Sequence, residues 1–200
     1  MTTGLYLAHL NPLTKAHVEI INQIKEEADL VKVMPVVFRL GKKEVTSKSF
    51  PFSFEVRKKM VESVFGDSVL VTDDYTFYAP FKKYLPPLLS RKSWQLRRQI
   101  LSGVNKDFFS YTGDKAEGYM LKLYRLKPKI GQRKELSASS VKDKMYEAAL
   151  GKNSKWKKDV PDSVANIIEE NWEIVKQFAK LEDKTQRVLG MKFPLEGWSE

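Results

Sequence analysis

The stretch GLYLAHLNPLTKAH, residues 4–17, decides the fold of this chain. Its apolar first part, residues 4–8, predicts a buried strand, and the polar residues around Pro12 predict a tight loop. Apolar residues recur at helical spacing after His17, so the loop opens a helix. A strand, a short loop and a helix N-terminus form a common anion site, because outward N–H groups and the helix dipole favour negative charge. Thr14 and His17 add a hydroxyl and an imidazole that can hold a phosphate group.

Composition restricts the class of protein. The 200 residues, 42% of them hydrophobic, suit one domain with a real core. The absence of cysteine and the presence of only His9 and His17 exclude disulfides, thiolate nucleophiles and zinc sites built on cysteine or several histidines. Because no apolar run approaches the length of a membrane span and no signal-like segment opens the chain, we expect a cytoplasmic protein without a membrane partner.

The net charge of +10 is spread along the chain rather than gathered in one patch. Such a spread argues only weakly for nucleic acid as a partner, whereas a small anionic substrate needs only a few of these charges.

Predicted strands and helices alternate along the chain. Strands are expected at residues 30–38, 69–71, 107–112 and 127–130, and helices at 54–65, 94–101, from 116 onward, 139–150 and 162–180. This alternation predicts an α/β fold with a doubly wound, mostly parallel sheet and C-terminal helices over residues 1–180. Residues 181–200 are expected to form a tail.

Three loops are predicted to meet at the carboxyl ends of the strands, where ligands bind in doubly wound sheets. They are residues 11–17, 113–114 and 136–142. In the third loop we expect Ser139 to cap the following helix and leave N–H groups free for a phosphate. Lys142, one turn further on, would place a positive charge beside the same anion.

Two of these loops resemble the signatures of the nucleotidylyltransferase superfamily. The Asn-Pro-Leu-Thr-x-x-His run of residues 11–17 resembles its Thr/His-x-x-His signature, and Ser-x-Ser-x-x-Lys at 137–142 resembles its Ser-x-Thr-x-x-Arg signature. Residues 51–57 and 156–164 are similar to the Pro-Phe-Thr-x-x-x-Arg and Trp-x-x-x-Val-Pro-x-x-Val elements of archaeal-type nicotinamide-nucleotide adenylyltransferases. The resemblance extends over roughly residues 4–180 in the same order.

This resemblance implies a Rossmann-like fold and an enzyme that transfers a nucleoside monophosphate from a triphosphate to a phosphorylated acceptor. The reaction it favours joins ATP and nicotinamide mononucleotide to give NAD and pyrophosphate, with Mg²⁺ accompanying the triphosphate. It implies catalytic roles for His17, Thr14 and Lys142, and no dedicated protein ligands for the metal. The implied nucleotide or phosphate contacts are Leu7, Ala8, Asn11, Ser137, Ser139, Gly113 and Asp114, with Arg57, Lys42 and Lys43 as weaker candidates.

Four positions depart from the family pattern. Ala8 and Ala16 stand where glycine is usual, Thr14 replaces the commoner histidine, and Lys142 replaces arginine. Lysine cannot make the planar, bidentate contact that arginine makes with phosphate. These departures leave the identity of the acceptor open.

Two alternatives stay open at this point. A cytidylyltransferase that activates a phosphorylated alcohol or sugar shares both signatures, and its Gly-Asp-Asp element is similar to Gly113-Asp114. The net charge and the four departures also allow a nucleic-acid-binding or regulatory module on the same scaffold. Aromatic residues of the tail, Phe193 and Trp198, would either fold back on the domain or meet a second copy in a homo-oligomer.

Overall fold

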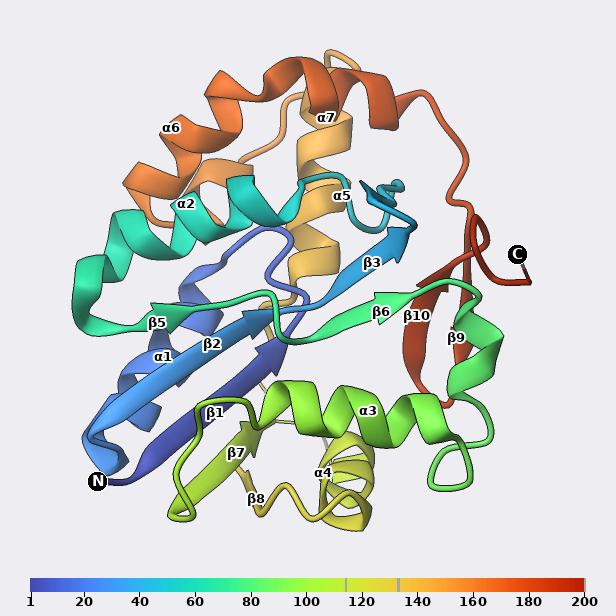
Figure 1. Cartoon of the computed structure of the whole chain (residues 1–200). Helices are drawn as coiled ribbons and strands as arrows, with labels where there is room; N and C mark the ends of the chain where they lie inside the picture. The colour runs from blue at the N-terminus through green and yellow to red at the C-terminus, as the bar shows by residue number, and fades with distance from the viewer. Residues whose placement is uncertain (114, 133, 200) are drawn as a thin grey trace.

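The protein is described by a computed structural model over residues 1–113, 115–132 and 134–199 (Figure 1). Its main strands are β1 (Thr3–Ala8), β2 (Leu30–Pro35), β5 (Leu70–Val71), β7 (Phe108–Thr112) and β8 (Pro128–Ile130). They form one sheet in the order β5-β2-β1-β7-β8, and every pairing in it is parallel. The predicted α/β fold with a doubly wound parallel sheet is therefore confirmed.

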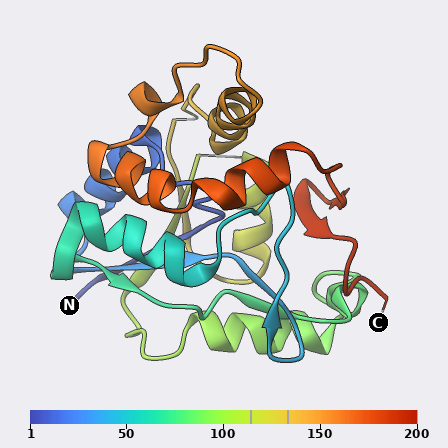
Figure 2. The ribbon, with the colours of Figure 1, turned by 90° about the horizontal axis from the view of Figure 1, so that it is seen from above.

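Helices cover both faces of this sheet. They are α1 (Lys15–Glu27), α2 (Phe54–Phe65), α3 (Arg91–Ile100), α4 (Lys115–Leu123), α5 (Ala138–Ala149), α6 (Asp162–Glu170) and α7 (Trp172–Ala179). Apolar side chains of α1, α2 and α5–α7 pack on one face, and those of α3 and α4 pack on the other. Figures 1 and 2 show α6 running beside α2 on the first face. Within the described part of the chain, no helix has the length and apolarity needed to cross a membrane.

Strand β1 is buried on both sides, which explains its continuous apolar sequence. Leu5 and Leu7 join the core beneath α3 and α4, whereas Tyr6 joins the core beneath α1. A Cβ atom at Gly4 would lie 2.2 Å from Cγ2 of Ile24 in α1, so glycine lets that helix pack directly on the strand. The loop that follows β1 thus begins at the end of the central strand, which is packed on both faces.

Two predicted elements are each divided in the structure. The strand expected at residues 30–38 ends at Pro35, and the chain then enters a second sheet of order β4-β3-β6. The helix expected at 162–180 is interrupted at Asn171, between α6 and α7. The second sheet consists of β3 (Val37–Leu40), β4 (Lys43–Glu44) and β6 (Thr76–Tyr78), and short 3₁₀ turns are η1 (Gly66–Ser68), η2 (Phe81–Tyr84) and η3 (Trp156–Asp159).

The last twenty residues, which we expected to be a tail, contain a β-hairpin. Strands β9 (Thr185–Val188) and β10 (Met191–Pro194) are antiparallel and joined by two residues with positive φ, Leu189 at 50° and Gly190 at 85°. Such a turn matches the twist of the flanking strands, although leucine is an unusual residue for its first position. The Leu-Gly pair therefore gives little sequence signal for a hairpin.

Phe193 packs this hairpin against the rest of the domain. Its side chain is 5% exposed, and its ring centroid lies 5.5 Å from that of Phe38 and 5.4 Å from that of Phe77. These two rings belong to β3 and β6, so the hairpin packs against the second sheet (Figure 1). The aromatic residue of the presumed tail therefore folds back on the domain.

We expect the Phe193→Ala variant to lower the free energy of unfolding by about 3–5 kcal/mol, because it removes a buried aromatic ring from a packed cluster. Urea unfolding followed by circular dichroism measures this change. Leu195→Ala is the matched control, since Leu195 is 49% exposed, and its effect should stay within about 0.5 kcal/mol. Equal effects of the two substitutions would contradict the packing of the hairpin.

Candidate active site

The candidate site lies where the order of the sheet reverses. From β1 the chain continues to β2 on one side, whereas β7 pairs with β1 on the other side. In doubly wound sheets ligands bind at this point, beyond the carboxyl ends of the strands. Leu7 and Ala8 are the last residues of β1, and Gly113 follows β7 directly, as the sequence predicted. Asp114 lies outside the described residues.

The start of α1 fixes the orientation of His17. The His17 backbone N–H donates to Thr14 Oγ1 over 3.4 Å, and the Thr14 backbone N–H donates to His17 Nδ1 over 3.0 Å. This reciprocal pair is a capping box in which histidine replaces the usual glutamate. Because Nδ1 accepts a hydrogen bond, the neutral ring carries its proton on Nε2. His17 therefore has an Nε2–H group that can donate a hydrogen bond.

The charge state of His17 agrees with this assignment. Burial, and after it the positive charge of Lys142, lowers the pKa of His17 from 6.5 to about 4. The imidazole is neutral at pH 7, so any role it has toward a phosphate is that of a hydrogen-bond donor and not of a cation.

Asn11 links two segments that the sequence placed in the site separately. Its fully buried side-chain amide donates to the carbonyl of Phe52 over 2.9 Å and accepts from the Phe52 N–H over 3.2 Å. Phe52 lies just before α2, so this pair of bonds fixes the residues leading into that helix against the loop after β1. The amide, which we expected to contact nucleotide, is occupied by this structural role.

Lys142 joins the two signature loops. Its side chain is 8% exposed, and Nζ donates to the backbone carbonyl of Asn11 over 2.9 Å. Burial, followed by the charge of Lys192, lowers the pKa of Lys142 from 10.5 to about 8, while Asp143 and Asp183 oppose the shift. At pH 7 the group is still mainly an ammonium. A buried cation thus lies between the start of α1 and the start of α5.

The start of α5 differs from our expectation in one residue. Ser137, and not Ser139, is the cap: Ser137 Oγ accepts the Ser140 N–H over 3.1 Å. Ser139 lies in the first turn, and both serines are exposed to solvent. The expectation was wrong because Ser-x-Ser offers two capping hydroxyls, and tertiary packing decides which backbone turns first. The first N–H groups of α5 still face outward, as a phosphate site at this helix start requires.

Arg57 acts on the backbone in this structure. The side chain is 3% exposed, and Nη1 donates to the carbonyls of His9 over 2.9 Å and Val36 over 2.7 Å. Nη2 forms an ion pair with Glu44 at 3.0 Å, and Glu44 also accepts the Phe54 N–H at the start of α2. Arg57 therefore links α2 to the segments after β1 and β2. It helps to fix the backbone of the candidate site through these carbonyls.

Lys42 lies on the turn between β3 and β4, Lys43 is the first residue of β4, and both are exposed. Lys43 Nζ is 3.0 Å from Glu196 Oε1, so its nearest charged partner belongs to the C-terminal segment. A contact of either lysine with phosphate stays a prediction.

Two residues beside the site gave no clear sequence signal. The ring of His9 stacks on Phe50 at 4.8 Å between centroids, and its buried Nδ1 atom has no hydrogen-bond partner among the described residues. Burial, and then the charges of Lys142 and Arg57, lower the pKa of His9 to about 3. Lys192 of β10 is close enough to contribute to the shifts of both His9 and Lys142. Only the folding back of the hairpin brings that lysine here.

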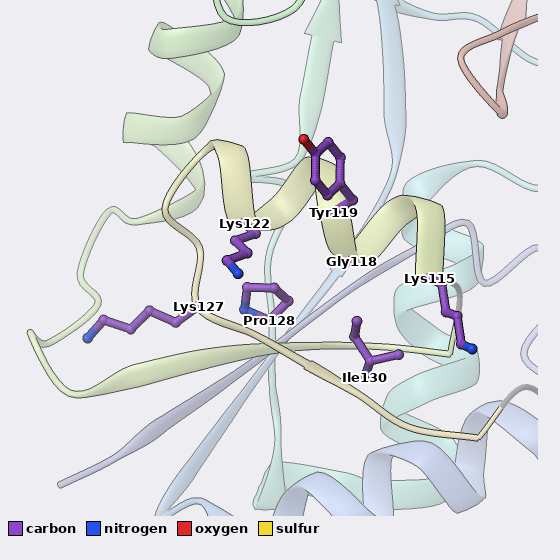
Figure 3. Close-up of a pocket in the computed structure, with 7 residues that line it drawn as sticks. All are labelled: Lys115, Gly118, Tyr119, Lys122, Lys127, Pro128 and Ile130. Carbon is purple, nitrogen blue, oxygen red and sulfur yellow. The ribbon is translucent and has the colours of Figure 1, made fainter.

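A hollow of about 580 Å³ lies elsewhere, at the outer edge of the sheet (Figure 3). Its walls come from α4, β8 and the connection between them, with exposed Tyr119 and Ile130 and the lysines at 115, 122 and 127. Gly118 also lines the hollow, and a Cβ atom there would lie 2.7 Å from Ile130 Cδ1, so glycine lets α4 pack closely on β8. None of these residues belongs to the signature loops. We therefore place the candidate site beyond β1 and β7, where the order of the sheet reverses, and not in this hollow.

Solved structures share this fold at low sequence identity. A bifunctional NMN adenylyltransferase/ADP ribose pyrophosphatase from Francisella tularensis, complexed with AMP and a manganese ion, aligns with a TM-score of 0.64 and 14% identity over 89% of this chain and 52% of its own. Another structure of such a protein from that organism gives 0.60 and 14% over 92% and 58%. A candidate nicotinate-nucleotide adenylyltransferase from Vibrio parahaemolyticus gives 0.54 and 9% over 88% and 96%.

These likenesses show that the chain shares its Rossmann-like fold with these solved structures. It spans a little over half of the Francisella proteins, 52% and 58% of their lengths. Searches with family models and with curated protein sequences find no match.

We expect the free energy of unfolding to fall as pH drops from about 6.5 toward 4. Both histidines have depressed pKa values in the folded protein, so the unfolded chain binds more protons in this window. Each contributes a slope of up to about 1.4 kcal/mol per pH unit. Urea unfolding of the wild type and of His9→Gln, at steps between pH 7 and 4.5, measures the difference in slope.

The NMR signals of the two Hε1 protons give an independent measurement. Neither should titrate above pH 5 in the folded protein, because burial lowers the pKa to about 3 for His9 and about 4 for His17. A midpoint near 6.5 for either ring would show that this imidazole is solvated and not buried.

Proposed function

We propose that this chain is a nucleotidylyltransferase that joins ATP and nicotinamide mononucleotide to give NAD and pyrophosphate. The observation that carries the proposal is the environment of Lys142. This cation is 8% exposed and bonded to a carbonyl, and none of the ion pairs among the described residues includes it. A buried cation without a bonded carboxylate is stabilised when an anion binds beside it.

The surroundings of Lys142 favour a phosphate chain as that anion. The bond from Lys142 to Asn11 joins α5 to the loop before α1, and the N–H groups that begin these helices can bind an anion, as can the Nε2–H group of His17. The fold shared with structures named as adenylyltransferases, and the resemblance of both signature loops to the superfamily, support the same reading.

The proposed reaction needs a positioned triphosphate and no protein nucleophile. An oxygen of the acceptor phosphate attacks the α-phosphorus of ATP, the bond from that phosphorus to the bridging oxygen breaks, and pyrophosphate leaves with the electron pair. His17 and Thr14 hold the reacting phosphates as charge develops, and Lys142 neutralises the departing pyrophosphate. Ser137 and Ser139 hold the outer phosphates at the start of α5.

The metal enters with the substrate in this proposal. No group of three or more potential ligands from His, Cys, Asp or Glu occurs among the described residues. Mg²⁺ bound to the triphosphate oxygens meets the hard-ligand preference of that ion without a protein cage. Its contribution would be to draw charge from the phosphates.

The other predicted residues fall into two groups, those that would border the nucleotide and those that hold the backbone of the site. We propose that Leu7, Ala8, Gly113 and Asp114 border the nucleotide, since three of them end β1 or follow β7 and the fourth is next in sequence. Asn11 and Arg57 are positioning residues in this proposal, because their polar groups bind the backbone. Lys42 or Lys43 would add a further contact to phosphate.

The test begins with the choice of substrates. Purified protein is incubated with ATP or CTP and with each acceptor, and pyrophosphate release is followed. Turnover of ATP with nicotinamide mononucleotide supports the proposal, whereas turnover of CTP with a phosphorylated alcohol or sugar, and none with ATP, replaces it with a cytidylyltransferase. Steeply salt-dependent RNA or DNA binding without triphosphate turnover would identify a nucleic-acid-binding module.

We expect His17→Asn to lower kcat/KM by about a hundredfold or more, as when a transition-state donor is lost. Asparagine places a polar atom near the position of Nδ1, so it can keep the capping interaction with Thr14 while the Nε2–H donor disappears. The melting temperature should therefore stay near that of the wild type. Turnover at the wild-type rate would place the active site elsewhere.

The rate should also fall at alkaline pH. The pKa of Lys142 is about 8 in the free protein, so kcat/KM should decline about tenfold per pH unit well above pH 8 as the ammonium is lost. A Lys142→Arg variant stays charged throughout this range, and its profile should be flat there. An active Lys142→Arg enzyme that keeps the same alkaline decline would contradict the role of this charge.

A further inference from the structure

The C-terminal hairpin brings a second lysine to the candidate site. In β10 successive side chains point to opposite sides, so the burial of Phe193 in the aromatic core directs Lys192 away from that core. Lys192 Nζ donates to Ser49 Oγ over 2.8 Å and lies 3.4 Å from Asp183 Oδ2. Its side chain is 32% exposed, so a ligand can reach it.

Residues 47–50 connect this lysine to α5. The Tyr146 hydroxyl, one turn beyond Lys142, donates to the carbonyl of Lys48 over 2.7 Å. The adjacent Ser49 bonds to Lys192, so a short chain of contacts joins the two lysines. The segment is also fixed to the end of α7, because Lys48 Nζ donates to the Ala179 carbonyl over 3.2 Å.

Two buried polar atoms in the same region have no partner. They are His9 Nδ1 and Ser47 Oγ, neither of which has a hydrogen-bond partner among the described residues. Ser47 forms a bridge with Phe50, and Phe50 stacks on the His9 ring, so both atoms lie around the segment that holds Lys192. Ser47 is 6% exposed. Unsatisfied buried polar groups of this kind are rare and are often completed by a ligand or water.

Asp183 is the carboxylate paired with Lys192. Its Oδ2 atom accepts from Ser49 Oγ over 2.7 Å and from Thr185 Oγ1 over 3.0 Å, and it pairs with Lys192. Partial burial opposes ionisation, but the hydrogen bonds from Ser49 and Thr185 and the charge of Lys192 hold the pKa of Asp183 below its ordinary value. The carboxylate therefore serves as an internal anion for two hydroxyls and an ammonium.

We propose that Lys192 binds a phosphoryl group of a substrate, and that Asp183 holds this lysine in the unliganded protein and competes with the phosphate for it. The inference rests on the proposed function, which supplies phosphorylated substrates to the site. Lys142 and Lys192 then receive the same anionic ligand from α5 and from the hairpin. The mutual repulsion of the two ammonium groups is relieved when phosphate binds between them.

Binding of inorganic pyrophosphate tests the proposal without turnover. Isothermal titration calorimetry should show binding weakened at least tenfold by Lys192→Gln and tightened several-fold by Asp183→Asn. The control is Lys184→Gln, which removes the same charge from an exposed lysine next to Asp183 and should leave the affinity within about twofold. If Asp183 competes with phosphate for Lys192, the two substitutions must change pyrophosphate affinity in opposite directions.

A purely structural ion pair gives a different pattern. In that case both substitutions would lower the melting temperature, and neither would change pyrophosphate affinity, or both would weaken it. Either result overturns the proposal. Asparagine retains an acceptor for Ser49 and Thr185, so the Asp183→Asn protein should keep its fold and its affinity can be compared directly.

Steady-state kinetics identify the phosphate. A raised KM for ATP in Lys192→Gln assigns the lysine to the triphosphate, and a raised KM for the acceptor assigns it to the acceptor phosphate. Unchanged KM values for both, together with unchanged pyrophosphate binding, reject the role of Lys192 while the proposed reaction stands. If instead the wild type turns over no triphosphate but the binding results hold, the phosphate site stands and the proposed reaction falls.

Discussion

The candidate site depends on one buried hydrogen bond, from the Lys142 ammonium to the backbone carbonyl of Asn11. It joins residues 131 positions apart and sets the start of α5 against the loop after β1. The side chain of Asn11 extends the link to Phe52, and Arg57 extends it to the carbonyl of His9. Leaving such a buried group without its partner costs about 1–3 kcal/mol, so these segments hold one arrangement.

The same construction leaves the site short of negative charge. Glu44 is bonded to Arg57, and Asp183 is bonded to Lys192, whereas Lys142 rests on a carbonyl. Burial keeps both histidines neutral at pH 7, so they add no positive charge to that of the lysines. A phosphate that binds here would meet donors that are already held in place. Such preorganised donors stabilise negative charge strongly, because they need not rearrange when it develops.

Much of the framework could be predicted from local pattern. The long apolar runs at β1, β2 and β7 and the helical spacing in α1, α2 and α5 are each several residues long, so their periodicity is readable. The second sheet and the hairpin escaped this reading because their strands have two to four residues and owe their form to packing. The division at Asn171 and the choice of Ser137 as cap also depend on tertiary contacts.

The sequence by itself determined the α/β fold class, the loop between β1 and α1, and the spacing that aligns Thr14 with His17, because these depend on neighbours in the chain. Only the tertiary structure decided what surrounds Lys142. His9, residues 47–50 and Lys192 come from distant parts of the chain, and no local pattern relates them. The motifs supply Lys142 and His17, but burial in the folded protein lowers the pKa values of both, and packing of the hairpin adds the charge of Lys192 beside Lys142.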